Sequence, residues 1–279
     1  MTIVVRATDP PHDVTQPRGK QYWQTKIEGI WYHPTTGIWQ TVWLEFVPSS
    51  RIGRATITTD IDRGTIRVAA DLVNVGTTTT KAAEQTAGAR LVVTASLEGI
   101  PVAESSSLIS NDTAHAVVDL CVLVSGLERP SSLTKAIARE AWHEGLALWS
   151  PEHPSLYTLQ LTLQQSIQKG QSVVLDQVTT YAGMRKIHIA DGKIYLNNKR
   201  LFQALSLDQG YWPQAGLTAP TDEDFKQDIL LMKQAGLNGC RKHQKVEDPR
   251  FLYWADKLGY LVWSEMANAY DYSQQGALR

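Results

Sequence analysis

The chain has 279 residues, a formal net charge of −1, 43% hydrophobic residues and 20% charged residues. This composition is typical of a folded globular protein of about two domains. The near-neutral charge gives no electrostatic basis for binding nucleic acid or a membrane surface, and no run of apolar residues is long enough to predict a transmembrane helix. Cys121 and Cys240 lie far apart, so we expect two buried thiols, with no metal site and no cofactor.

Residues 1–48 are rich in tryptophan, and two stretches have the pattern of strands. One is TIVVRA near the start, and in the other Val42, Leu44 and Phe46 alternate with Trp43 and Glu45. Two or three strands cannot form a core alone, so this region predicts the end of a larger β-domain. We therefore expect the true N-terminus to lie upstream, and a cytoplasmic location is favoured.

Residues 49–182 contain six runs of alternating apolar and polar residues, which predict strands near 55–61, 65–75, 89–99, 115–123, 155–164 and 172–181. Turns are expected at Gly64, Gly76, Gly99 and Lys169–Gly170. Several short strands at this spacing are typical of an immunoglobulin-like β-sandwich. Residues 133–140 are compatible with a helix.

Residues 183–279 change to an alternation of strands and helices. A small hairpin leads into a strand that ends near residue 207. Thr221 and Asp224 form a capping box for a helix that ends at Gly236, and Asp248–Pro249 begins a second helix that ends at Gly259. Strands are expected at 237–241 and 260–266. This order predicts a parallel α/β sheet with right-handed crossovers.

Four segments, taken in order, resemble family 2 glycoside hydrolases, the family of β-galactosidase and β-glucuronidase. GIWQTVWLE resembles the end of their sugar-binding jelly roll, and LWSPEHPSLYTLQL the last strands of their sandwich domain. YAGMRKIHIADGKIYLNNKRLFQALSLDQG resembles the entry to their catalytic (β/α)₈ TIM barrel, and residues 222–266 its first units. The resemblance implies a multi-domain β plus α/β protein: residues 1–48 as the jelly-roll tail, 49–182 as the sandwich and 183–279 as a truncated barrel.

The resemblance also implies a retaining β-glycosidase, which uses two carboxyl groups about 5–5.5 Å apart. In the family, the acid/base follows an Asn on the fourth barrel strand and the nucleophile lies on the seventh. A barrel takes about 250 residues, far more than residues 183–279 supply, and the chain contains no Asn-Glu pair. We therefore assign no catalytic residue, place both carboxylates beyond Arg279, and expect the chain alone to be inactive.

Barrel enzymes carry their chemistry at the C-terminal ends of the strands, which here are followed by polar residues. Glu265 matches the acidic residue of the family's third-strand motif, and Arg241 matches its second-strand arginine. Glu265 either contacts sugar or caps a strand in solvent, and Arg241 either contacts sugar or pairs with Glu265.

Three further residues are candidates for substrate binding: Asp208, Trp212 and His243. An ungapped alignment places Gln244, not His243, opposite the family's sugar-binding histidine, and a lone histidine is more often structural. Trp212 lies in the first strand-to-helix loop, where its face could stack on a sugar. Trp39 and Trp43 are expected to pack between domains.

The leading hypothesis is a β-galactosidase-like enzyme acting on β-galactosides or related sugars. Its expected partner is a carbohydrate, with neither nucleic acid nor membrane, and the whole enzyme could be a homo-oligomer. One alternative is a non-catalytic carbohydrate-binding or scaffold module built from the sandwich. Another is a mannosidase or glucuronidase of the same family.

Overall fold

A computed structural model describes residues 2–75, 88–109, 115–166 and 171–271. The chain divides into two compact units, Glu45–Phe202 and a second unit that combines Met1–Leu44 with Gln203–Arg279. Each unit has its own hydrophobic core. Over the described ranges, no helix is both long and apolar enough to cross a membrane. The division into domains 1–48, 49–182 and 183–279 stays a prediction.

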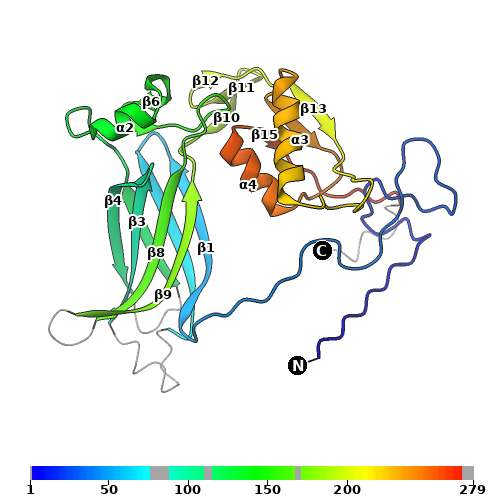
Figure 1. Ribbon diagram of the computed structural model, residues 1–279, viewed down its shortest axis with the longest axis horizontal. Helices are drawn as coiled ribbons and strands as arrows, with labels where there is room; N and C mark the ends of the chain where they lie inside the picture. Colours follow the sequence, from blue (N-terminus) through cyan, green and yellow to red (C-terminus); the bar gives the residue numbers. More distant parts are fainter. Residues whose placement is uncertain (1, 76–87, 110–114, 167–170, 272–279) are drawn as a thin grey trace. The chain divides into compact units, whose positions relative to one another are not determined.

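Two antiparallel sheets build the unit Glu45–Phe202 (Figure 1). The order is β1-β2-β5 in one sheet and β4-β3-β8-β9 in the other, and every pairing is antiparallel. The prediction of an antiparallel sandwich is therefore confirmed. The strands are β1 (Arg51–Asp60), β2 (Thr65–Val73), β3 (Ala89–Leu97), β4 (Ile100–Leu108), β5 (His115–Cys121), β8 (Tyr157–Ser166) and β9 (Ser172–Ala182).

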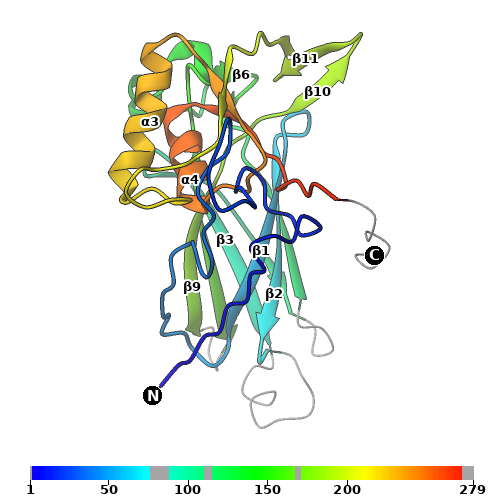
Figure 2. The same ribbon diagram turned by 90° about the vertical axis from the view of Figure 1, so that its right-hand side faces the viewer.

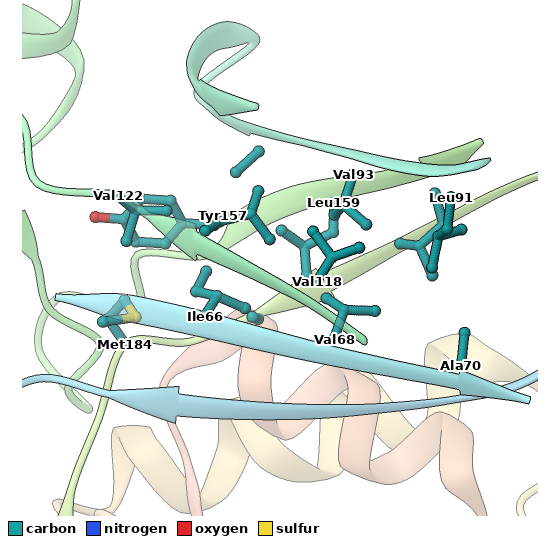
Figure 3. Close-up of a cluster of buried hydrophobic side chains, with 14 of the residues drawn as sticks. Ile66, Val68, Ala70, Leu91, Val93, Val118, Val122, Tyr157, Leu159 and Met184 are labelled. Carbon is teal, nitrogen blue, oxygen red and sulfur yellow. The ribbon is translucent and has the colours of Figure 1, made fainter. Parts of the chain in front are cut away.

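The core of the sandwich follows from the alternation along its strands. Every second residue of β3 is buried, and β5 and much of β8 repeat the pattern, because successive side chains of a strand point to opposite faces. Figure 3 shows Val68, Val118 and Leu159 in the layer between the sheets. The buried Tyr157 hydroxyl accepts a hydrogen bond from the Ala147 N–H at 3.0 Å. The core thus combines aliphatic packing with a satisfied polar group.

Shorter elements complete this unit. They are α2 (Ser131–Ala136), the 3₁₀ helix η1 (Arg139–Ala141), the pair β6 (Trp142–His143) and β7 (Leu146–Ala147), and the small sheet of β10 (Ile187–Ala190), β11 (Lys193–Leu196) and β12 (Lys199–Arg200). The predicted hairpin is confirmed. The helix expected over 133–140 is right only in part, because Ile137 already has an extended backbone.

The second unit holds a parallel sheet in the order β13-β14-β15, with two helices between its strands. Figure 2 shows α3 and α4 side by side. The elements are β13 (Leu205–Asp208), α3 (Asp222–Gln234), β14 (Gly239–Lys242), α4 (Pro249–Leu258) and β15 (Leu261–Trp263). Both pairings are parallel, as predicted.

The helix boundaries in this unit are those that the sequence signals predict. Thr221 and Asp224 exchange the two hydrogen bonds of a capping box at the start of α3. The Asp248 side chain accepts from the Arg250 N–H at the start of α4. Gly259 ends α4 with a φ of 71°, a left-handed conformation that glycine adopts without steric cost.

Both strands expected within residues 1–48 are wrong. Over the described part of this region the backbone forms only an isolated bridge between Gln21 and Tyr32. The side chains of Val42, Leu44 and Phe46 are exposed. An alternating pattern becomes a strand only when a neighbouring strand accepts its backbone hydrogen bonds, and the described residues offer none to this segment.

Cys121 is exposed and only Cys240 is buried, because Cys121 ends β5 on the face opposite the core. The strand β4 went unpredicted, since Ser105–Ser107 hide its alternation. Gly64 and Gly99 lie in turns as expected, whereas the turns at Gly76 and Lys169–Gly170 fall outside the described residues.

The buried core of the sandwich generates a stability prediction. Leu161→Ala removes a fully buried side chain of β8, so we expect the free energy of unfolding to fall by about 2–5 kcal/mol. Leu108→Ala is the matched control in β4, where the side chain is 65% exposed, and should change the free energy of unfolding by less than about 1 kcal/mol. Urea titration measures both. Equal losses in the two variants would contradict this account of the core.

Candidate functional site

The loops that follow β13, β14 and β15 lie at one edge of the parallel sheet, because the three strands run in the same direction. Asp208 and Lys242 are register partners at the ends of β13 and β14, and Arg241 pairs with Trp263 of β15. All the polar residues that follow these strands are therefore collected at the edge where barrel enzymes carry their chemistry.

The two faces of the sheet differ. Cys240 packs with Phe225 and Phe251 of the two helices, so the helices cover its face. Lys242, two residues on, lies on that same face and Arg241 on the other, because strand side chains alternate. The face of Arg241 also carries Leu207 and Trp263, which are 57% and 47% exposed. The sequence alone did not predict which of these residues lie on which face of the sheet.

Arg241 and Glu265 form an ion pair on the face away from the helices. The Arg241 Nε donates to Glu265 Oε1, and the Gln244 backbone N–H donates to Glu265 Oε2 at 2.8 Å. Their side chains are 49% and 27% exposed, so the pair is open to solvent and not fully buried. The expectation that both residues lie at one rim is confirmed, and so is the pairing left open for Arg241.

Electrostatics keep Glu265 ionised. Burial alone would raise its pKa, but the hydrogen bond from the Gln244 N–H and the charge of Arg241 outweigh burial, so the pKa lies below its ordinary value. Burial lowers the pKa of His243, and Arg241 and Lys20 lower it further against the opposing effect of Glu265. His243 Nδ1 lies 3.2 Å from Gln209 Nε2. The site thus presents an anionic carboxylate beside an imidazole biased toward its neutral form.

Asp208 lies in a buried charge network on the helix-covered face. Lys242 Nζ lies 2.5 Å from Asp208 Oδ2 and 2.9 Å from Glu247 Oε2, and the lysine is only 1% exposed. Lys245 Nζ lies 2.9 Å from Glu247 and donates to the carbonyls of Gly210 and Leu217. The network therefore joins the ends of β13 and β14 to the loop after β13.

The two lysines of this network respond differently to burial. Burial disfavours the charged form of Lys242. Its attraction to the carboxylates of Asp208 and Glu247 outweighs burial, so its pKa is raised. At Lys245 burial has the larger effect and lowers the pKa. The attraction of Glu247 opposes burial, but repulsion by Lys242 weakens that opposition. Lys245 and Glu247 were not singled out from sequence. The signal available was the density of charges in the segment KHQKVED, which is unusual directly after an apolar strand.

Trp212 lines a pocket of about 230 Å³ beside α3. Its ring meets Phe225 edge to face at 6.1 Å, so one side of the tryptophan belongs to the core. Tyr32 and Tyr211 stack at 4.0 Å at the same pocket, and burial followed by repulsion from Asp208 raises the pKa of Asp228. The full lining is Tyr32, Leu207, Asp208, Gln209, Gly210, Tyr211, Trp212, Asp228 and Met232. Trp212 and Asp208 thus share one pocket, apart from the Arg241–Glu265 pair.

Residues of the first 44 positions pack against the loops after β14 and β15. The N–H groups of Arg18 and Gly19 donate to the Asn268 carbonyl at 3.1 and 3.0 Å. The Tyr270 hydroxyl donates to the Gly19 carbonyl at 2.6 Å, and Trp23 and Trp31 surround its ring. This segment supplies a wall of the site.

Trp39, expected to pack between domains, also lies in this unit. Its carbonyl accepts a hydrogen bond from the Thr218 hydroxyl, and Lys245 Nζ lies 5.6 Å from its ring. Among the residues that the structure describes, no three His, Cys, Asp or Glu side chains are placed to hold a metal ion.

Comparison with known proteins gives consistent results. The family described as "Glycosyl hydrolases family 2" matches residues 50–185. A putative beta-glucuronidase of Formosa agariphila is 28% identical over 236 residues, which are 82% of this chain and 24% of that protein. A beta-galactosidase of Staphylococcus xylosus is 30% identical over 118 residues, 42% of this chain and 11% of that protein. The chain thus spans a quarter or less of the length of these relatives.

Solved structures share the fold. A beta-glycosidase from Bacteroides vulgatus has a TM-score of 0.60 at 17% identity, over 85% of this chain and 26% of that one. Beta-glucuronidase 2 of Bacteroides uniformis has a TM-score of 0.58 at 21% identity, over 79% of this chain and 24% of that one. The chain thus shares its fold with glycosidases of known structure. Residues 50–185 match the family 2 glycosyl hydrolases, and the relatives and solved structures support a fragment of a protein of this family.

The buried network generates a second stability prediction. Lys242→Met leaves Asp208 and Glu247 without their shared cation, so the free energy of unfolding should fall by about 3–5 kcal/mol. Lys226→Met is the control, since Lys226 pairs with an exposed Glu223 on α3, and it should cost no more than about 1 kcal/mol. Chemical denaturation followed by tryptophan fluorescence measures both. A neutral effect of Lys242→Met would show that the network is not a structural requirement.

The lowered pKa of Glu265 predicts a pH dependence. A carboxylate with a depressed folded-state pKa stabilises the protein above its unfolded pKa, and this stabilisation is lost as pH falls through the folded pKa. The difference in unfolding free energy between wild type and Glu265→Gln should therefore be largest at neutral pH and shrink as the pH falls below the ordinary range of a glutamate and through the lowered folded-state pKa. Glu28→Gln, in a surface pair with Lys26, should show little difference at any pH. A difference for Glu265→Gln that grows on acidification would contradict the assignment.

Proposed function

We propose that this chain is part of a retaining β-glycosidase that hydrolyses β-galactosides or related sugars. The observation that carries the proposal is the Arg241–Glu265 pair, held at the C-terminal ends of neighbouring parallel strands on the face that the helices leave open. In a barrel that face is the interior, and its C-terminal rim is where substrates bind. The family match and the glycosidase names of the relatives support the same conclusion.

We propose the domain assignment on similar grounds. Two antiparallel sheets over one core suit an immunoglobulin-like sandwich. The parallel strand–helix–strand–helix–strand order suits the first units of a (β/α)₈ barrel, and the exposed Leu207 and Trp263 suit a face that further strands would cover. Residues 1–48 would then be the tail of a jelly roll.

Arg241, His243 and Glu265 are the residues that we assign to sugar contact. The carboxylate of Glu265 can accept hydrogen bonds from sugar hydroxyls, while Arg241 fixes its position. We assign Asp208 a different role, because its carboxylate faces the helices and is held by Lys242. Trp212 belongs with Asp208, and both would shape the loop after β13.

The same geometry supports our expectation that the chain alone does not hydrolyse glycosides. Retention requires two carboxyl groups about 5–5.5 Å apart across the scissile bond. Glu265 is one carboxylate on the open face, and the nearby Asp208 and Glu247 are engaged by buried Lys242 on the other. We therefore assign no nucleophile and no acid within this chain.

A non-catalytic carbohydrate-binding or scaffold module is the second candidate. The observation in its favour is that the family match, residues 50–185, falls almost wholly on the sandwich strands. On this hypothesis the sandwich itself binds sugar, and the strand ends of the parallel sheet are not used.

Binding and turnover by the whole chain test the proposal. Titration calorimetry with methyl β-galactoside should give weak binding that Glu265→Gln reduces about tenfold or more, because a charged hydrogen bond is lost. Asp256→Asn on α4 is the control and should leave binding unchanged. An aryl β-galactoside should not be hydrolysed, since removal of a catalytic acid or nucleophile costs orders of magnitude in rate.

Three outcomes would count against parts of the proposal. Binding that is insensitive to Glu265→Gln would favour the carbohydrate-binding module. The absence of binding to any β-glycoside would contradict a sugar site in this chain. Hydrolysis that disappears in Glu265→Gln would place a catalytic carboxylate among the residues described above.

A further inference from the structure

Gln209 and His243 lie side by side where the first two strands of the parallel sheet end. Gln209 directly follows β13 and His243 directly follows β14, and the His243 backbone N–H donates to the Asp208 carbonyl at 2.7 Å. This hydrogen bond continues the ladder that pairs the two strands. The two side chains meet, with Gln209 Nε2 at 3.2 Å from His243 Nδ1. The backbone ladder therefore sets up a contact between a side-chain amide and an imidazole.

Both side chains belong to the open face of the sheet. Asp208 and Lys242 turn toward the helices, and the residues that directly follow them start on the opposite side, because side chains alternate along a strand. The charges of Glu265 and Arg241 act on the His243 ring, which fits this placement. Gln209 thus contacts a ring that shares its face with the Arg241–Glu265 pair.

The chemistry of the amide decides which ring nitrogen carries the proton. An amide nitrogen donates hydrogen bonds, so Gln209 Nε2 at this distance requires a lone pair on His243 Nδ1. A neutral imidazole has one N–H and one lone pair. The ring proton of neutral His243 therefore sits on Nε2.

The surroundings also favour the neutral ring over the imidazolium. Burial lowers the pKa of His243, and the charges of Arg241 and Lys20 lower it further against the opposing charge of Glu265. A protonated Nδ1 would also point its N–H at the donor atom of Gln209. The contact and the charges thus favour the same form of the ring.

The Nε2 atom of His243 is open to a ligand. Among the residues that the structure describes, none hydrogen-bonds to this atom, and it is not one of their buried polar atoms that lack a partner, so solvent reaches it. Glu265, whose charge acts on the same ring, is an ionised acceptor. The edge therefore offers an N–H donor near a carboxylate acceptor.

We propose that Gln209 is a positioning residue that holds His243 in its Nε2–H form, so that the imidazole donates a hydrogen bond to an oxygen atom of the sugar. The inference rests on the proposed glycosidase function, and it adds a residue and a direction of hydrogen bonding to that site. The lone pair of the neutral ring is used by Gln209. His243 consequently serves the ligand as a donor and not as a base.

Nitrogen NMR of the whole chain tests the tautomer without any ligand. Long-range ¹H–¹⁵N correlation distinguishes protonated from unprotonated ring nitrogens, and the loss of signals in His243→Ala assigns the ring. Wild type should show a protonated Nε2 and an unprotonated Nδ1. Gln209→Glu replaces the donor by a carboxylate oxygen of the same shape, so the proton should move to Nδ1 and the pKa of His243 should rise.

Two further variants make this test independent of how well Gln209→Glu folds. Gln209→Met keeps the length of the side chain but removes the donor, so His243 should show a mixture of both tautomers. Gln227→Glu, at an exposed glutamine of α3, is the matched control and should leave the tautomer and the pKa of His243 as in wild type.

Binding of methyl β-galactoside, measured by calorimetry, tests the role of the donor. Gln209→Glu should weaken binding about two- to tenfold, the usual loss for one neutral hydrogen bond. In a chain that already carries His243→Ala, the same substitution should have no further effect, because Gln209 acts through the imidazole. A purely structural role of Gln209 would weaken binding equally in both backgrounds and would overturn the inference.

The remaining outcomes separate this inference from the proposed function. A wild-type ring protonated on Nδ1, or a tautomer that ignores both Gln209 variants, would overturn the inference and leave the proposed sugar site at Arg241 and Glu265 standing. The expected tautomer with binding that is insensitive to Gln209→Glu would overturn the donor role alone. Absence of binding in wild type would overturn the proposed function, and the inference with it.

Discussion

The ammonium of Lys242 is the point on which the arrangement of the candidate site depends. It joins Asp208 at the end of β13 to Glu247 in the loop after β14, and through Glu247 it is linked to Lys245. Lys245 in turn holds the carbonyls of Gly210 and Leu217. Two short strands and the loop after β13 are thus joined by charges withdrawn from water. Such groups are costly unless every one has a partner, so the geometry of the edge is tightly constrained.

Burial of these charges on one face determines what the other face can do. With Asp208 and Lys242 turned toward the helices, Arg241 and Glu265 are the charged groups left on the open face. The Gln244 N–H, directly before Lys245, donates to the second oxygen of Glu265. The loop after β14 thus contributes to both, through Lys245 and Glu247 to the buried network and through the Gln244 N–H to the exposed pair.

Local signals were sufficient for most of the fold. The six predicted sandwich strands, the capping box at Thr221 and the αL glycine at position 259 follow from patterns that neighbouring residues complete by themselves. The alternation of Val42, Leu44 and Phe46 failed because a strand also needs a partner, and none is present among the described residues. β4 was not predicted because its serines hide the apolar–polar alternation. It forms a strand nevertheless, because β3 supplies the backbone pairing.

The candidate site was predictable only in part. Arg241 and Glu265 could be placed together, because both end parallel strands of one sheet. The separation of Asp208 from them required the register of β13 against β14, which no local pattern encodes.

The hydrogen bonds from Gly19 to Asn268 and from Tyr270 to Val14 join residues about 250 positions apart in the chain. Translation proceeds at about 5–20 residues per second, so on the ribosome the first segment waits roughly 12–50 seconds for its partners to be made. During this time Trp23 and Trp31 have no Tyr270 ring to pack against. The beginning of the chain therefore cannot complete its packing until the end of its unit has been made, and until then Trp23 and Trp31 remain without this partner.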